Sequence, residues 1–351
     1  MDKKFVMSIA AMAALTLVSC SSDDLDSLSD NSSKNEAISF DGYLGRSAVA
    51  VNGTRGSEET VNTLKTKGFG VFGNYIAGAG QTSDANFFKN QQVTYSTEKS
   101  QWYYSPLRYW PAQGHIDFVA YAPYADGTTL TNTSLDFDVK DKAADQKDLL
   151  WANAANTTKG TVTFNFAHAL SRLGYSVKLE DASSESVATI TLNKITLAGT
   201  APGSTTGSTK KAFYTKGTID LSQGSWTSKS DDRKDFDWFS ETPSVTPSVT
   251  ITSSPTTNTD YLFVIPQDFS TGNAKTDELY VIVEYTIKYT SGTAQPTVSY
   301  KVYKKLEKNF EQGKAYTINL NIGLTPIEFN AAVTDWVTTE NPINDIPVTW
   351  N

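Results

Sequence analysis

The sequence predicts an all-β protein built from two β-sandwich domains. Almost every apolar segment is short, rich in β-branched and aromatic residues, and bounded by Gly, Asn, Asp, Ser or Pro. Polar and apolar side chains alternate with a period of two, most clearly in 317–324. A chain of 351 residues has room for two domains of ordinary size, which we place at 36–167 and 168–351.

The N-terminus has the pattern of a bacterial lipoprotein signal. Lys3 and Lys4 precede an apolar run, 5–18, that is too short to span a membrane and stops at "LVSC" rather than at an A-x-A site. We therefore expect residues 1–19 to be removed and the Cys20 thiol to carry a diacylglycerol, so that acyl chains such as palmitate bind the precursor to a membrane. Cys20 is the only cysteine, which excludes an intramolecular disulfide and a cysteine metal site.

Residues 20–35 are an acidic tether, with "SSDDLDSLSD" directly after the lipidated cysteine. This stretch also resembles the acidic export tag that sends lipoproteins of the Bacteroidota to the outer face of the outer membrane, and both interpretations remain open. The formal net charge is −8, and it becomes −9 once Asp2, Lys3 and Lys4 leave with the signal. A chain this acidic has no basic patch for phosphates, so we exclude nucleic acid as a partner.

The first expected strand, 38–45, leads into sequence that a protease can cut. The residues that give this strand its pattern are Ile38, Phe40, Tyr43 and Leu44. Small and polar residues follow, interrupted by two isolated arginines, Arg46 and Arg55.

Further strands are expected along the rest of the chain, at 68–76, 115–124, 160–166, 173–180, 186–199, 260–267, 278–289, 297–306 and 314–324. The only segment with a helical pattern is 167–173, "AHALSRL", which we expect to connect strands or domains. The Pro-, Ser- and Thr-rich stretch 240–260 predicts an extended loop or an edge strand, because proline donates no ladder hydrogen bond.

Groups that could carry chemistry are few. The two histidines, His115 and His168, stand apart without an H-E-x-x-H pattern, and we interpret both as hydrogen-bonded structural residues. The sequence has no nucleophile elbow, phosphate loop or dinucleotide fingerprint. We therefore expect no catalysis, no cofactor and no metal.

Several motifs occur in an order that resembles the fimbrillin family, the type V pilins of the Bacteroidota. They are the lipobox Cys20, "ISF" at 38–40, the loop arginines, "GFGVFGNY", "WYYSPLRYWPAQGHIDFVAYAPY", "KDLLWA", "VTFNFAHALSRLGYSVKL", "YLFVIPQ", "GKAYTINLNI" and "IEFNAAVTDW". No one of these strings is specific, but their order and spacing cover about 38–340.

The resemblance implies a fimbrial subunit with two transthyretin-like β-sandwich domains. Such subunits reach the cell surface as lipidated precursors anchored to the outer membrane. An arginine- or lysine-specific protease then removes the N-terminal segment with its lipid, and the loss of the first strand opens a hydrophobic groove. The C-terminal strand of a neighbouring subunit fills this groove by donor-strand exchange, which builds a fimbrium of copies and related subunits that serves in adhesion. We place the cut after Arg55 or Arg46 and favour Arg55.

The donated element implied by the resemblance is the tail 329–351. Its side chains spaced to fill a groove are Val333, Trp336, Ile343, Ile346, Val348 and Trp350. Pro342 and Pro347 disfavour a central strand in the tail's own domain. The alternative is a tail that packs on its own subunit as an edge strand.

Two other functions compete with the fimbrial one. A surface glycan-binding lipoprotein would use exposed aromatic residues of "WYYSPLRYW" at 102–110, or Trp226, Trp238 and Phe239, as a sugar platform. A β-sandwich glycosidase would need two carboxylates roughly 5–10 Å apart in a cleft.

Overall fold

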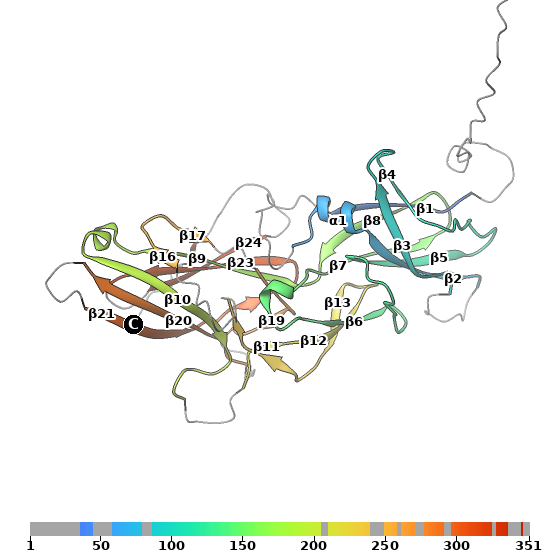
Figure 1. Cartoon of the computed structure of the whole chain (residues 1–351). Helices are drawn as coiled ribbons and strands as arrows, with labels where there is room; N and C mark the ends of the chain where they lie inside the picture. Colours follow the sequence, from blue (N-terminus) through green and yellow to red (C-terminus); the bar gives the residue numbers. More distant parts are fainter. Residues whose placement is uncertain are drawn as a thin grey trace, which may run out of the picture.

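The structure is a computed structural model of the whole chain. It describes residues 36–44, 58–78, 86–204, 210–238, 249–257, 261–270, 277–290, 296–324, 328–335 and 345–346. Within these ranges the chain is almost entirely β-structure, arranged as an elongated molecule with the N-terminal strands at one end and the C-terminal strands at the other (Figure 1). The prediction of an all-β fold is confirmed.

The N-terminal sheet has seven strands in the spatial order β1-β8-β7-β5-β2-β3-β4. Only the pair β1 and β8 is parallel; the other neighbours run antiparallel. The strands are β1 (Ser39–Leu44), β2 (Phe69–Ile76), β3 (Phe88–Ser96), β4 (Gln101–Tyr103), β5 (His115–Ala122), β7 (Leu150–Thr157) and β8 (Thr161–His168).

The C-terminal part contains two larger sheets. In one, β10 (Ala188–Ala198) pairs with β15 (Phe236–Asp237), β16 (Val249–Ile251) and β20 (Tyr280–Tyr289), and β20 pairs with β21 (Thr297–Lys305). The other contains β9 (Ser171–Leu179), β17 (Thr256–Thr257), β18 (Leu262–Val264), β23 (Lys314–Ile322), β24 (Glu328–Asp335) and β25 (Asp345–Ile346).

A smaller sheet joins the two halves of the sequence. In it β12 (Lys216–Asp220) pairs with both β6 (Ser134–Asp138) and β13 (Ser225–Lys229), so a strand of the predicted first domain pairs with one of the second. Two short pairs complete the β-structure, β11 (Phe213–Tyr214) with β14 (Arg233–Lys234) and β19 (Gln267–Asp268) with β22 (Asn309–Phe310). The division at residue 167 stays a prediction.

Buried side chains form two clusters. The N-terminal cluster gathers aromatic residues from β1, β2, β3, β5 and β8, whereas the larger cluster lies mainly between the C-terminal sheets. Strands β2 and β5 contribute to both, since Phe69 and Phe118 face the first cluster while Phe72 and Val119 face the second. Burial on both faces explains why these strands are apolar almost throughout.

The helix predicted at 167–173 is wrong. Ala167 and His168 end β8, and Ser171 begins β9, so the segment passes directly from one sheet to the next. His168, Leu170 and Leu173 are all buried. The segment is apolar because it packs on several sides, and not because one face of a helix is buried.

The α-helix α1 (Val61–Lys67) was not predicted. Leu64 is its only buried residue, so it lacks an apolar stripe. Its local signal is a capping box in which Thr60 and Thr63 satisfy each other's backbone N–H groups. In the described ranges the other helical turns are the 3₁₀ segments η2 (Ala143–Asp145) and η3 (Ala182–Ser186), and no helix there is long and apolar enough to cross a membrane.

Candidate functional site

Strand β1 lies at one edge of the N-terminal sheet. It pairs with β8 in register from Ser39 opposite Thr161 to Leu44 opposite Phe166. Ile38, Phe40 and Leu44 point into the core and are buried, whereas Tyr43 is 54% exposed. At the inward position between them stands Gly42, where an added Cβ would lie 3.0 Å from the Phe69 ring. The sequence prediction of a strand here is therefore confirmed, with Tyr43 on its outer face.

The Phe40 side chain is the centre of an aromatic cage. Its ring centroid lies 5.1 Å from Tyr104, 5.4 Å from Phe88, 5.6 Å from Phe118 and 5.8 Å from Phe164. The Tyr104 hydroxyl donates a 2.9 Å hydrogen bond to the Ile38 carbonyl oxygen. Burial raises the pKa of Tyr104, so this hydroxyl remains a donor across the physiological range.

The other side of β1 faces a groove. Among the described residues, backbone partners on this side stand just before the strand, where the Ile38 N–H donates to the Arg108 carbonyl and the Trp110 N–H donates to the Glu36 carbonyl. From Ser39 to Leu44, no strand in the described ranges pairs with this edge. The groove beside it has a volume of about 1030 Å³ and is lined by β1, α1, the β3–β4 hairpin and Leu107.

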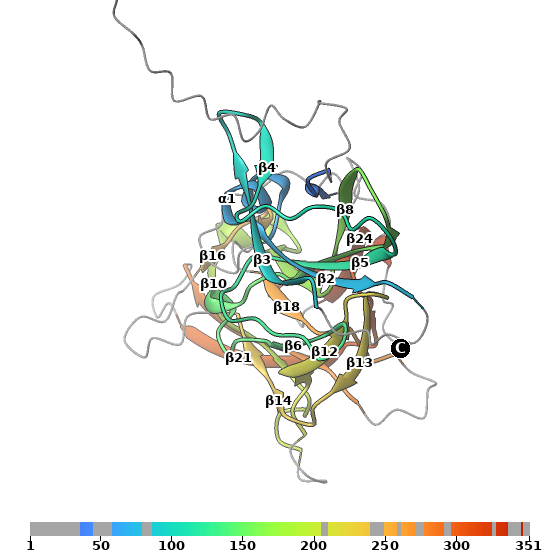
Figure 2. The ribbon, with the colours of Figure 1, turned by 90° about the vertical axis from the view of Figure 1, so that its right-hand side faces the viewer.

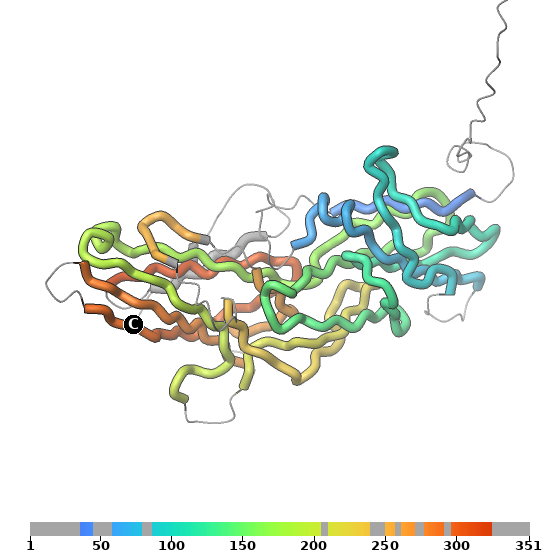
Figure 3. The backbone as a smooth tube through the Cα atoms, in the orientation of Figure 1, coloured from blue at the N-terminus to red at the C-terminus, as the bar shows by residue number. Residues whose placement is uncertain are grey.

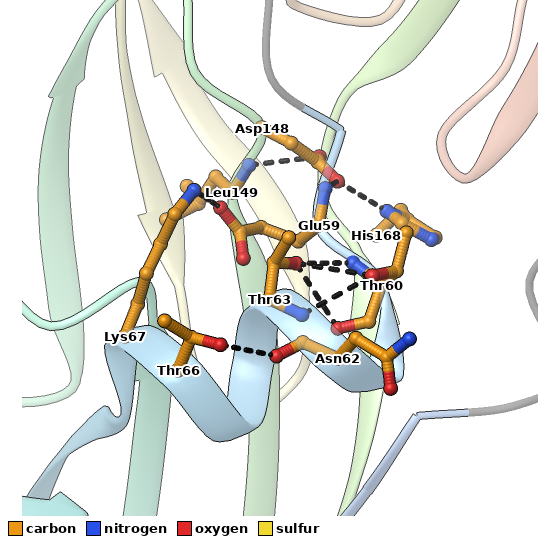
Figure 4. A network of polar contacts seen from close by, with 9 residues as sticks. All are labelled: Glu59, Thr60, Asn62, Thr63, Thr66, Lys67, Asp148, Leu149 and His168. Atoms are coloured by element: carbon orange, nitrogen blue, oxygen red, sulfur yellow. Dashed lines mark hydrogen bonds and ion pairs between the residues drawn. The ribbon is translucent and has the colours of Figure 1, made fainter. Parts of the chain in front are cut away.

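The chain that follows the arginine-containing segment 45–57 is fixed to the body of the protein (Figure 4). Glu59 is fully buried, and its carboxylate accepts a hydrogen bond from Lys67. The Glu59 backbone N–H donates to the Asp148 carboxylate at 3.2 Å, and the same oxygen lies 2.6 Å from His168 Nδ1. Glu58 forms an ion pair with Arg172 at the start of β9. Residues 58–60 are therefore held where β7, β8 and β9 meet.

Burial is the dominant influence on Glu59. It raises the pKa of this carboxyl, the Lys67 ammonium opposes the shift, and the neighbouring Asp148 charge adds to it. His168 is buried against Asp148, as expected for a structural histidine, while His115 Nε2 on β5 lies 3.8 Å from Asp117. Sequence reasoning missed the Glu59–Asp148 contact because these residues are far apart in the chain.

Several predicted site residues lie outside the described residues. They are Cys20, Arg46, Arg55, Trp336, Ile343, Val348 and Trp350. Of the tail, Val333 lies in β24 opposite Tyr316, and Ile346 lies in β25 opposite Ala331. The described part of the tail thus pairs within its own subunit.

The aromatic residues considered for a sugar platform are partly buried and partly exposed. Trp238 is buried, and the Trp226 indole donates a 2.8 Å hydrogen bond to the Ala169 carbonyl. In the 102–110 run, Tyr104 and Trp110 are buried while Tyr103 and Tyr109 are exposed. Phe239 lies outside the described residues, and among those described there is no cluster of metal-ligating side chains.

Comparison with known proteins identifies the class as fimbrial subunits. The chain is 26% identical over 370 residues to the fimbrium subunit Fim1C of Phocaeicola vulgatus, covering 91% of this chain and 93% of that protein. The crystal structure of a fimbrial protein from Bacteroides vulgatus has the same fold, with a TM-score of 0.64 and 24% identity over 86% of this chain and 99% of that one.

The model of the fimbrillin-like family matches residues 54–336. The chain belongs to this family, which confirms the resemblance drawn from its motifs. The family consists of fimbrial structural subunits, which argues against catalysis.

Replacing Phe40 should destabilise the N-terminal sheet more than any other change in β1. We expect Phe40→Ala to lower the free energy of unfolding by about 3–5 kcal/mol, because the cavity would be enclosed by four rings. Tyr43→Ala is the matched control on the same strand and should change it by less than about 0.5 kcal/mol, since Tyr43 is exposed. Urea unfolding of the unlipidated chain measures both, and equal losses would contradict the assigned orientation of β1.

Glu59 should make stability depend on pH. Because its pKa is raised above 4.5, folding favours the protonated carboxyl, and that contribution is lost as the pH rises through the folded-state pKa. The Glu59→Gln variant lacks this loss, so its free energy of unfolding should improve relative to the parent between pH 4.5 and neutrality. Urea midpoints across this range measure the difference. Glu98→Gln, at an exposed site, controls for removal of a charge, and a parallel trend in both variants would refute the assignment.

Proposed function

We propose that this chain is the precursor of a fimbrial shaft or tip subunit that polymerises after its first strand is cut away. The observation that carries the proposal is the position of β1, an edge strand that fills an aromatic cage and precedes the segment with Arg46 and Arg55 in the sequence. Beyond that loop the chain is tied down again at Glu58 and Glu59. A cut between Leu44 and Glu58 would leave β1 attached by non-covalent contacts alone.

The burial of β1 contributes substantially to the stability of the precursor, but the contribution is small enough for the strand to be displaced after a cut. Ile38 and the two buried apolar side chains of β1, Phe40 and Leu44, contribute about 2 kcal/mol each, roughly 6 kcal/mol together. That is of the same order as the total stability of an ordinary domain. Once the chain is cut, losing β1 exposes the rings around Phe40 and the backbone edge of β8, which an incoming strand would cover again.

The cut is proposed after Arg55, with Arg46 as the other candidate. Both arginines lie between the last residue of β1 and Glu58, so either cut would separate the strand from the anchored chain. A cut after Arg55 would remove the whole loop with β1, whereas a cut after Arg46 would leave residues 47–57 on the mature subunit. An arginine-specific protease is the implied partner.

The tail 329–351 is the proposed donor. Ile346, Val348 and Trp350 alternate strictly, which is the pattern of a strand with one buried face. A tail donated to the next subunit is a heterologous contact that does not close, so repetition gives a filament of copies and related fimbrial subunits.

The proposed route begins at the outer membrane. Lipid on Cys20 would hold the precursor at the cell surface, and proteolysis would release it from the lipid into the growing fimbrium. Adhesion is the function proposed for the fibre.

Cleavage in the loop should convert monomers into head-to-tail oligomers. Treating the unlipidated chain with a trace of arginine-specific protease should give one cut near Arg46 or Arg55, loss of β1 and a ladder of oligomers. Mass spectrometry and size-exclusion chromatography measure these steps. The Arg46→Lys/Arg55→Lys double variant keeps the charge and should resist this enzyme, yet trypsin should still cut it and produce the ladder. Cleavage without oligomers would count against polymerisation.

The tail should be needed for donation but not for cleavage. A chain ending at Asn341 should be cut normally and add to the end of a ladder as an acceptor, but its own copies should not polymerise. Val348→Asp should likewise prevent donation, because it places a charge on the apolar face of the tail. Thr349→Asp, one residue along and on the opposite face, is the matched control and should polymerise. Equal behaviour of the two aspartate variants would exclude the alternating tail as the donor.

A further inference from the structure

Two strand edges that no described strand pairs with lie near each other on the N-terminal sheet. β1 is the first strand and β4 the last in the sheet order, and each pairs with a single neighbour among the described strands. The sheet curls so that β1 and β4 come close to each other (Figure 3). Turned by 90°, the β3–β4 hairpin stands beside α1 as one wall of this end (Figure 2). An unpaired edge exposes backbone N–H and C=O groups, which an extended peptide satisfies.

The groove also gathers exposed apolar side chains. Tyr43, Val61, Tyr103 and Leu107 are large hydrophobic residues that remain at least 37% exposed, and all four line it. Tyr109 is 51% exposed and forms an isolated β-bridge with Ala37, just before β1. Exposed apolar residues concentrated in one place mark a site of interaction. A free strand edge inside such a groove selects a peptide in extended conformation as the ligand.

We propose that this groove holds the C-terminal segment of a second copy before β1 is removed. The inference rests on the proposed function and adds a step that precedes the cut. The six residues of β1 span roughly 20 Å. Residues 337–351 are long enough to cover that edge once Asp345 and Ile346 leave their pairing with β24 of their own subunit. The alternation of Ile346, Val348 and Trp350 then lets the segment turn one apolar face to the groove. The chain end has no lysine or arginine after Lys314, so it contains no further site for the protease.

Docking beside β1 would solve a kinetic problem of strand exchange. If β1 left an empty cage, the exposed aromatic rings would be open to aggregation until a donor arrived. A tail already paired with the outer edge of β1 lies about one strand spacing, 4.8 Å, from the position that β1 vacates beside β8. The second step is then intramolecular, at a high effective concentration.

The test is binding of a fluorescent peptide of residues 337–351 to the uncut full-length unlipidated chain. The Arg46→Lys/Arg55→Lys variant keeps the chain uncut during the measurement, and fluorescence anisotropy follows binding. We expect saturable binding that the Tyr103→Lys/Leu107→Lys double variant weakens at least tenfold, because both side chains line the groove. Tyr303→Lys is the matched control, since Tyr303 on β21 is 48% exposed like Tyr103, and it should bind as the parent does.

The outcomes separate this inference from the function on which it rests. Binding to the trypsin-cut chain but not to the uncut one would overturn the proposal that the tail binds the groove before the cut. It would leave donor-strand exchange intact. Binding to neither would remove support from both. Equal binding of a scrambled peptide, or no effect of the Tyr103 and Leu107 changes, would show that the tail does not occupy this groove. Much tighter binding to a chain ending at Asn341 would assign the groove to the chain's own tail and overturn the proposal for a second copy.

Discussion

The insertion of one aromatic side chain from an edge strand is the interaction on which the N-terminal sheet depends. Phe40 contacts rings from β3, β5, β8 and the segment after β4, so it joins both ends of the sheet order into one core. Yet β8 is the one described strand that pairs with β1, and β1 contributes just two buried apolar side chains, Phe40 and Leu44. A central part of the core is thus supplied by a strand that is paired along one edge only.

The anchored residues 58–60 determine which side of a cut stays attached to the protein. Glu58 and Glu59 bind residues at the junction of β7, β8 and β9, where the two clusters of buried residues meet. Burial of Glu59 beside Asp148 is costly, and Lys67 only partly offsets it. The cost makes sense if the chain must remain fixed on this side of the loop while the other side is released, because removing Arg55 and the residues before it leaves every one of these contacts in place.

Patterns of local residues predicted most of the fold, and long-range contacts account for the failures. Period-two alternation located β23, and runs of β-branched and aromatic residues located β2, β5, β10 and β20 within a few residues. The prediction of a helix at 167–173 failed because this segment crosses between two cores and is buried on several sides. Such burial gives an apolar run without the alternation of a strand. Of the candidate site, Ile38, Phe40 and Leu44 were visible in the sequence. The groove and the Glu59–Asp148 contact were not, since both form between segments distant in the chain.

The shape of the cage restricts which strand can replace β1. The inward positions of β1 are Phe40, Gly42 and Leu44, so two large side chains flank a position that has no side chain. The middle position is restricted because the rings of Phe69 and Phe166 lie against it. In the tail, Ile346, Val348 and Trp350 have the same spacing, and the smallest of the three is in the middle. An antiparallel match would set Trp350 in the aromatic cage of Phe40 and Val348 at the shallow position, where a Cβ alone already requires the Phe69 ring to yield by a few tenths of an ångström and the two γ-methyl groups require more. Under the proposed function, the glycine of the departing strand therefore fixes the register of the arriving one.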